Sequence, residues 1–473
     1  MTDTKQENQT PQASLLGPIL LSALTPAILG KKLRNLLLRL EEPTIPCEQT
    51  IKQNHLSATE QYKYRIAILA TSQEELISHV REALCQIRLQ PQKQISKQSG
   101  IYYNAGASTS PVAFVFPGQG SQYLGMTEML SRTWQPALAA WKQAAKLRFT
   151  GEKKSINEIV FPDSHGSKQT PEKHLKQLTD TQWAQPAIGT ASLAYLNLLQ
   201  CLGIQADAVG GHSYGELTAL YAAKAIDSDT LLKLARRRGE LMRDAANIPG
   251  AMTAVRSPAK KVEEILLAHH VKVRLANDNA PNQVVLSGTV DTIEQAEAVL
   301  ESQGLRVQRL PVATAFHSSV VESAEKPFLD TLTREDICTP NIPVYANTTG
   351  LPYPDGPRSI RKTLSSQITN TVRFVEQINN MHQAGIRTFV EVGPGTVLSG
   401  LIRRILKGKE HTCISLNSKK TSDVTAFIHA IGRMWTLGIP MNIQNLWAEQ
   451  FSVEAPRTEL TVHRTEPSFA KVA

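Results

Sequence analysis

The stretch GGHSYGELTALY, residues 210–221, places Ser213 between two glycines and restricts the local fold more than any other part of the chain. One interpretation is a helix start. In S-x-x-E ahead of an apolar run, Ser213 accepts a hydrogen bond from the backbone N–H of Glu216, and Glu216 reaches back. This capping box leaves Gly211 and Gly215 unexplained, whereas a sharp strand-to-helix turn that exposes a nucleophilic serine needs small residues at both positions. These residues alone leave both interpretations open.

The flanking residues favour the sharp turn. Residues 204–226, IQADAVGGHSYGELTALYAAKAI, are typical of a short strand, a tight turn and an apolar helix. AFVF at 113–116 and TFVEVG at 388–393 are apolar runs of the kind found in buried parallel strands. The loop PGQGSQ at 117–122 has little side-chain bulk, so its backbone N–H groups could face a ligand. We therefore predict an α/β fold with a parallel sheet.

Residues 250–312 have a different pattern. A strand, a helix from about 258 to 269, two strands, a second helix across 291–303 and a final strand follow one another. This β-α-β-β-α-β order is that of a ferredoxin-like unit. We expect a small domain inserted into the large one.

The N-terminal residues are more ambiguous. Residues 14–30 are apolar but short for a membrane span, and Pro18 and Pro26 interrupt them. We predict one or two short helices here, continuing to residue 42, that dock on a neighbouring module or chain. Residues 62–90 are predicted to form a strand, a turn and a helix of a small α/β unit, and the polar residues 91–110 a linker.

The chain thus divides into six predicted parts. These are a helical or unassigned segment (1–55), the small α/β unit with its linker (56–110), the large domain in two pieces (111–248 and 314–410), the ferredoxin-like small domain (249–313), a following segment (411–450) and a mobile tail (451–473).

Composition excludes several classes of function. A chain of 473 residues with a net charge of +9 is long enough for two to three domains, and its basic residues are spread rather than clustered with aromatic ones. This argues against a nucleic-acid groove and favours anionic small ligands or an acidic protein partner. The five cysteines are scattered and form no C-x-x-C pair, which indicates a reducing compartment and disfavours a zinc site.

A nucleophilic Ser213 requires a general base, and twelve histidines are candidates. His317, in ATAFHSSV, lies where the chain returns from the inserted domain to the large one, so it could face a cleft between them. His212 is adjacent to Ser213, so its side chain should point away, and we interpret it as structural. The other candidates are expected to be solvated or packed, as for His269, His270, His382 and His429.

Two further features complete a candidate site. An oxyanion hole needs two backbone N–H groups, which the amide of Tyr214 and the 117–122 loop could supply. The stretch LARRRGELM, residues 234–242, places three arginines on a predicted helix. A solvated basic face would explain Arg236 and Arg237, whereas an arginine turned inward could hold a carboxylate through two hydrogen bonds.

Taken together, these motifs resemble a known family. In order along residues 111 to 445, the chain carries FVFPGQGSQYLGM, AQPAIGTASLAYL, GHSYGELTALYAA, RRRGELM, GAMTAV, NQVVLSGT, TAFHSS and EVGPGTVLSGLI. The set and its order are similar to malonyl-CoA:acyl-carrier-protein transacylases, the acyltransferase domains of fatty acid and polyketide synthases. Within that family the chain looks most like the domains of polyunsaturated fatty acid synthases and enediyne-type iterative synthases.

The resemblance implies an architecture. The large domain would be α/β-hydrolase-like, with the ferredoxin-like domain inserted in it. Residues 62–90 resemble the linker between ketosynthase and acyltransferase, and residues 411–450 resemble the segment that follows the acyltransferase. No ketosynthase precedes the linker here, and the chain starts with MTDTKQENQT, so we expect a discrete protein rather than an excised domain.

The resemblance also assigns residue roles. Ser213 would be the acylated nucleophile and His317 its base, with the backbone carbonyl of Gln367 orienting the imidazole. This chain departs from the family pattern at Thr371, where the family usually has proline. The remaining implied roles are backbone oxyanion donors at Gln119 and Tyr214, a carboxylate clamp at Arg238, and malonyl selectivity at Phe316 and Met242.

The implied reaction is a ping-pong malonyl transfer from malonyl-CoA through Ser213 to the phosphopantetheine thiol of an acyl carrier protein. No permanently bound cofactor and no metal are expected. Expected partners are the carrier protein and a ketosynthase or larger synthase subunit, with no nucleic acid and no membrane span, in the cytoplasm. Two alternatives remain: an acyl hydrolase or esterase that clears carrier proteins, which would not need Arg238, and a docking module with a decayed site.

Overall fold

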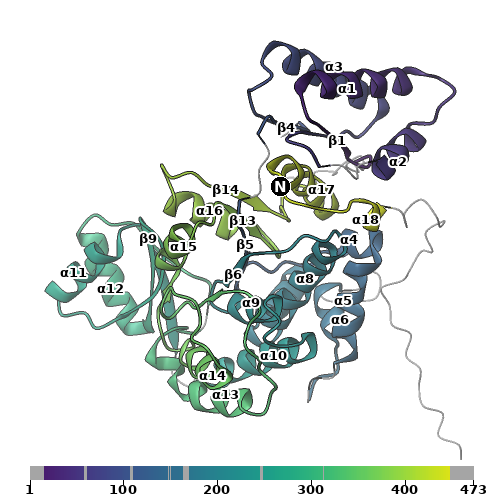
Figure 1. Ribbon diagram of the computed structural model, residues 1–473. Coiled ribbons are helices and arrows are strands. Elements are labelled where there is room, and N and C mark those ends of the chain that lie inside the picture. Colours follow the sequence, from purple (N-terminus) through teal and green to yellow (C-terminus); the bar gives the residue numbers. More distant parts are fainter. Residues whose placement is uncertain are drawn as a thin grey trace, which may run out of the picture.

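The computed structural model describes residues 15–57, 61–97, 99–106, 110–147, 149, 151–162, 170–245, 249–312 and 314–447. Three sheets organise these residues into a large domain, a small domain and an N-terminal unit (Figure 1). The predicted tail, 451–473, lies outside the described residues.

The large domain is built on a five-stranded parallel sheet with the order β11-β6-β5-β13-β14. The strands are β5 (Val112–Phe116), β6 (Ala208–Gly211), β11 (Val344–Tyr345), β13 (Thr388–Glu391) and β14 (Thr412–Ser415). All five residues of β5 are buried, because helices cover both faces of the sheet. The predicted α/β class with a parallel sheet is confirmed.

Alternate β5 residues belong to two cores. Phe114 packs into the core that contains α8, α9 and α10, whereas Val115 packs into the core that contains α15 and α16. The helices of this domain are α4 (Glu128–Thr133), α5 (Gln135–Lys146), α6 (Ile156–Val160), α7 (Pro171–Thr179), α8 (Thr181–Cys201), α9 (Gly215–Ala222), α10 (Ser228–Asp244), α13 (Glu325–Leu332), α14 (Pro357–Ser366), α15 (Phe374–Gln383) and α16 (Val397–Ile405), with a 3-10 helix at Ser319–Ala324.

The small domain has the predicted order of elements. These are β7 (Gly250–Val255), α11 (Ala259–Ala268), β8 (Arg274–Ala280), β9 (Gln283–Thr289), α12 (Val290–Ser302) and β10 (Val307–Arg309). The sheet order β10-β7-β9-β8 is that of a ferredoxin-like unit, which confirms this part of the fold. A two-residue strand from the large domain, β12 (Val372–Arg373), extends the sheet beside β8 and joins the domains.

The N-terminal unit differs from its prediction. Its elements are β1 (Ile19–Ala23), α1 (Pro26–Glu41), α2 (Cys47–Ser57), β2 (Tyr64–Ile68), α3 (Gln73–Leu89), β3 (Ile95–Lys97) and β4 (Ile101–Asn104). The predicted helices over residues 14–30 are wrong at Ile19–Ala23, because this segment forms a strand. The predicted linker over residues 91–110 is wrong at β3 and β4, which are also strands. A short apolar run suits a strand or a helix equally, and β1 is a strand because β2 pairs with it antiparallel. This sheet therefore crosses the boundary drawn between residues 55 and 56.

A C-terminal helix connects this unit to the large domain. Helix α17 (Asp423–Leu437) lies between the N-terminal sheet and the large sheet, and α18 (Gln444–Trp447) follows it (Figure 1). Gly432 of α17 faces Ala67 and Tyr102, and the Arg65 guanidinium lies 4.9 Å from the Trp435 ring centroid. Among the described residues, no helix has the length and apolar character needed to cross a membrane.

Candidate active site

Ser213 occupies the sharp turn between β6 and α9. Its φ of 52° lies in the left-handed region, which a non-glycine residue rarely adopts. A Cβ on Gly211 would collide with the Gly215 backbone, and a Cβ on Gly215 would collide with the carbonyl oxygen of Phe116. Both glycines are therefore required by close backbone approach, and the strained turn presents the Ser213 hydroxyl above the sheet.

The capping box predicted from S-x-x-E does not form. Helix α9 starts at Gly215 and its first turn receives no side-chain cap. Instead, Glu216 is completely buried, and its carboxyl group accepts hydrogen bonds from the backbone N–H of Asn347 at 3.2 Å, from Gln367 Nε2 at 2.9 Å and from the Tyr353 hydroxyl. These long-range donors hold Glu216 away from the backbone of Ser213.

His317 and Ser213 face each other. His317 Nε2 lies 2.8 Å from Ser213 Oγ, and His317 Nδ1 lies 2.9 Å from the backbone carbonyl oxygen of Gln367. A carbonyl can only accept, so Nδ1 carries the proton and Nε2 is the acceptor beside the hydroxyl. Burial, with a further contribution from the Arg238 charge, lowers the pKa of His317 to about 3. The imidazole is therefore neutral and able to take a proton from Ser213.

Asn347 supports this turn and was not found from the sequence. Its Oδ1 accepts from the Ser213 backbone N–H at 2.6 Å, while its Nδ2 donates to the Gly211 carbonyl at 2.7 Å and to Gln377 Oε1 at 3.0 Å. The side chain is fully buried after β11. Nothing in IPVYANTTG marks this asparagine, because its partners lie more than a hundred residues earlier or thirty later in the chain.

Arg238 is a fully buried cation beside this pair. Its Nη2 donates to Gln367 Oε1 at 2.8 Å and its Nη1 to Gln185 Oε1 at 3.0 Å. Its Nε has no hydrogen-bond partner, and no carboxylate among the described residues forms an ion pair with it. Burial lowers the pKa of Arg238 to about 10, so it stays charged at neutral pH. A buried guanidinium with unused N–H donors is suited to bind an anion.

The proposed oxyanion donors lie on two segments in close contact. A Cβ on Gly118 would collide with the carbonyl oxygen of His212, so the 117–122 loop lies directly against the Ser213 turn. Gln119 follows Gly118 in this loop, and its side chain donates to Thr181 Oγ1 at 3.1 Å. The Tyr214 side chain is buried against Gly189 and leaves its backbone N–H at the start of α9.

Four other residues singled out from the sequence contact different parts of the two domains. Phe316 is half-buried and packs against the cores of both domains, and Met242 is buried with its Sδ 3.8 Å from Gln185 Nε2. His212 turns toward the small domain, where its Nε2 lies 2.7 Å from Asn279 Oδ1. The hydroxyl of Thr371 donates to the Leu275 carbonyl at 2.6 Å, a bond that proline could not make.

Comparison with known proteins identifies the family of the chain. The model of the acyl transferase domain family matches residues 113–440, more than half of the chain. The chain belongs to the acyl transferase family. It is 32% identical over 383 residues to one component of the polyunsaturated fatty acid synthase of Thraustochytrium sp., covering 76% of this chain and 13% of that component. It is 34% identical over 302 residues to a malonyl CoA-acyl carrier protein transacylase of Bacillus subtilis, covering 63% of this chain and 90% of the relative.

Solved structures share the fold. The acyltransferase domain from the second module of the salinomycin polyketide synthase aligns with a TM-score of 0.71 at 26% identity, covering 92% of this acyl transferase and 96% of that domain. The chain spans a small part of the first curated relatives it matches, 13% of the fatty acid synthase component and 26% of the polyketide biosynthesis protein ThaF of Burkholderia thailandensis.

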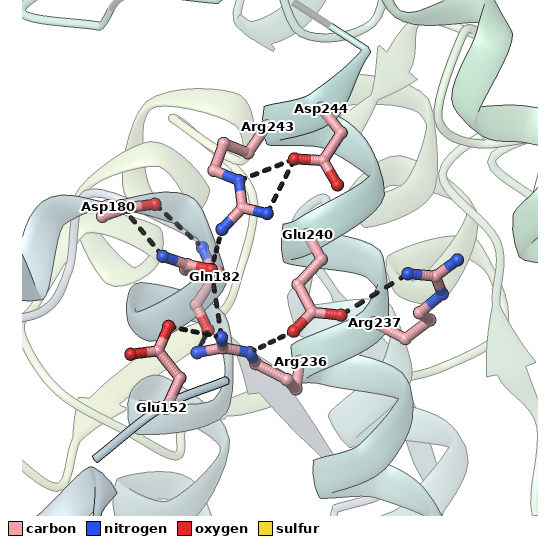
Figure 2. Close-up of polar contacts among 8 residues, drawn as sticks. All are labelled: Glu152, Asp180, Gln182, Arg236, Arg237, Glu240, Arg243 and Asp244. Atoms are coloured by element: carbon pink, nitrogen blue, oxygen red, sulfur yellow. Dashed lines mark hydrogen bonds and ion pairs between the residues drawn. The ribbon is translucent and has the colours of Figure 1, made fainter. Parts of the chain in front are cut away.

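The arginines beside Arg238 have separate roles in this acyl transferase. The prediction that Arg236 lies on a solvated basic face is wrong, because this residue is only 4% exposed. Its guanidinium lies over the rings of Phe149 and Trp183. It also forms ion pairs with Glu152 at 2.9 Å and with Glu240 at 2.6 Å (Figure 2). Arg237 points away from this cluster, with an exposed side chain 3.5 Å from Glu240 (Figure 2). Two carboxylates and two rings compensate the buried Arg236 charge, and local sequence cannot reveal them because they come partly from other segments.

No further ligand chemistry stands out in the described part of the chain. The five cysteines form no disulfide, and no cluster of three histidine, cysteine or acidic side chains that could hold a metal is present among the described residues.

Proposed function

We propose that this acyl transferase moves a malonyl group from malonyl-CoA to the phosphopantetheine thiol of an acyl carrier protein. The observation that carries the proposal is the buried Arg238, which has unused donors and is connected to Ser213 through the Gln367 side chain. Such a cation favours an acyl group that has its own free carboxylate. The name of the Bacillus subtilis relative specifies this donor and this acceptor.

The first half-reaction acylates Ser213. His317 Nε2 takes the hydroxyl proton while Ser213 Oγ attacks the thioester carbonyl, and the backbone N–H groups of Gln119 and Tyr214 are proposed to stabilise the oxyanion. The C–S bond then breaks, and coenzyme A leaves as a thiol with the proton from His317. The Gln367 carbonyl stabilises the transient imidazolium through its hydrogen bond to Nδ1.

The second half-reaction reverses these steps with a different thiol. The phosphopantetheine thiol gives its proton to His317 Nε2 and attacks the malonyl ester, and Ser213 leaves as an alcohol with that proton. Arg238 would hold the distal carboxylate in both steps. Phe316 and Met242 are proposed to border the acyl pocket, where Phe316 would disfavour a methyl branch by only about 1–3 kcal/mol.

The partners and location follow from the same proposal. An acyl carrier protein supplies the thiol, and a ketosynthase or larger synthase subunit would use the malonyl product, in the cytoplasm. The acyl hydrolase alternative is less well supported, because hydrolysis of simple acyl groups gives no use to a buried arginine with unused donors.

The direct test is intact-protein mass spectrometry after mixing with malonyl-CoA. We expect one malonyl adduct on the wild type and none on Ser213→Ala. Adding a phosphopantetheinylated carrier protein should remove the adduct and malonylate the carrier. An unmodified wild type would refute the transferase proposal, and loss of the adduct to water with no malonylated carrier would favour the hydrolase.

A further inference from the structure

Both groups that hold Arg238 are neutral carboxamides. Gln185 Oε1 accepts from Nη1 at 3.0 Å and Gln367 Oε1 from Nη2 at 2.8 Å. Gln185 and Gln367 are each 1% exposed, so both contacts with Arg238 lie in the protein interior. A buried arginine is usually paired with a carboxylate, as Arg236 is on the same helix with Glu152 and Glu240.

A carboxylate is near Arg238 but separated from it by one of these amides. Gln367 Nε2 donates to Glu216 Oε2 at 2.9 Å, while Oε1 of the same carboxamide accepts from Arg238. The Gln367 side chain thus lies between the buried Glu216 carboxyl group and the buried Arg238 guanidinium. Its Nε2 also donates to the Ser213 carbonyl at 2.6 Å, which fixes the orientation of the carboxamide.

The second carboxamide is oriented differently. Within the described part of the chain, Gln185 Nε2 has one partner, the sulfur of Met242 at 3.8 Å, so the strong interaction of this carboxamide is the one that its oxygen forms with Arg238. A glutamate would fit the same space and would form a direct ion pair with Arg238. The presence of glutamine at both positions leaves the Arg238 charge without a bonded anion.

We propose that Gln185 and Gln367 are positioning residues that determine acyl selectivity, because they hold the Arg238 guanidinium through neutral oxygens and reserve its charge for the carboxylate of the substrate. This inference rests on the proposed function. A protein carboxylate at either position would compete with the substrate for Arg238, whereas an acyl group without a carboxylate would be unaffected by that competition.

The test compares three donors on four proteins. Wild type, Gln185→Glu, Gln367→Glu and the control Gln377→Glu are acylated with malonyl-CoA, with acetyl-CoA and with 4-nitrophenyl acetate, a neutral ester that reports on Ser213 and His317. Gln377 is a buried glutamine that bonds to Asn347 and to the Tyr345 carbonyl but not to Arg238, so it matches the burial of an added carboxylate.

We expect Gln185→Glu and Gln367→Glu to lower the malonyl-to-acetyl ratio of kcat/KM by about tenfold or more, mainly through KM for malonyl-CoA. The ratio of acetyl-CoA to nitrophenyl ester reactivity should stay as in the wild type. Gln377→Glu should leave the malonyl-to-acetyl ratio unchanged, whatever it does to both rates. Gln367→Glu keeps the backbone carbonyl that His317 uses, but it sets a carboxylate oxygen against Glu216 and the Ser213 carbonyl. The ester reaction measures that disturbance, and the malonyl-to-acetyl ratio is compared after it has been taken into account.

Three outcomes would overturn the inference. An unchanged malonyl-to-acetyl ratio in both glutamate variants would do so, as would an equal drop in the Gln377→Glu control. If neither glutamate variant folds, Gln185→Met removes the oxygen without adding charge and should lower the ratio by about threefold to tenfold, and an unchanged ratio there overturns the inference. A wild type that malonyl-CoA does not acylate would instead refute the proposed function itself.

Discussion

Ser213 and His317 both hold a left-handed backbone, with φ of 52° and 56°, and their side chains meet at 2.8 Å across 104 positions of sequence. Strained backbone at both members of one pair persists only where the surroundings impose it. Asn347 bonds to the Ser213 N–H and to the Gly211 carbonyl, and the Gln367 carbonyl fixes the imidazole. The pair is therefore positioned before any substrate arrives.

Replacing Arg238 should remove selectivity rather than reactivity. In Arg238→Ala we expect kcat/KM for malonyl-CoA to fall by about a hundredfold or more, because the distal carboxylate of the malonyl group loses its cation. We expect kcat/KM for acetyl-CoA, which has no such carboxylate, to change far less. Steady-state transfer with both donors measures this. An unchanged malonyl-to-acetyl ratio would show that another residue binds the carboxylate.

The pH dependence of Ser213 acylation should differ from that of an ordinary histidine. The pKa of His317 is lowered to about 3 by burial and by the charges of Arg238 and His212, so Nε2 stays unprotonated at every pH above that value. We expect the rate with 4-nitrophenyl acetate to stay level from about pH 8 to pH 5 and to fall only in more acidic solution. Arg238→Ala should move the fall to higher pH. A midpoint near the ordinary histidine pKa would contradict this assignment.

Asn347→Asp tests the support of the turn. Asn347 Nδ2 donates to the Gly211 carbonyl and to Gln377 Oε1, so an aspartate would set a buried carboxylate oxygen against two acceptors. We expect the free energy of unfolding to fall by about 2–4 kcal/mol and acylation of Ser213 to slow. Urea unfolding measures the first effect. Asn379→Asp, at a partly exposed position on α15, is the control and should change stability little.

Gly189 and Tyr214 should behave as a coupled pair. A Cβ on Gly189 would collide with the Tyr214 hydroxyl oxygen but would lie 3.5 Å from the ring carbon that bears it, an ordinary contact. Gly189→Ala should therefore destabilise the protein by about 1–3 kcal/mol, and adding Tyr214→Phe should recover most of the loss. A double-mutant cycle of denaturant unfolding detects the coupling, and strictly additive effects would rule out this contact.

Much of the architecture could be predicted from the sequence because the signals are local. The inserted small domain was recognisable from the period of its strands and helices, and its sheet has the expected order. In contrast, β1 and β3 are short segments whose strand pairing depends on β2 and β4, so composition indicated a helix and a linker instead. The Arg236 environment was missed because identical neighbouring arginines differ only in what other segments place around them.

The stretch around Ser213 likewise has one feature that local sequence explains and one that depends on distant residues. The sequence by itself determined the sharp turn, because close backbone approach at Gly211 and Gly215 is a requirement that only glycine meets. Whether the capping box forms was decided by the tertiary structure alone. Glu216 forms no cap because Tyr353, Asn347 and Gln367 donate to it, and the Ser213 hydroxyl faces His317. Those partners are distant in sequence, and only the packed domains bring them within hydrogen-bond distance.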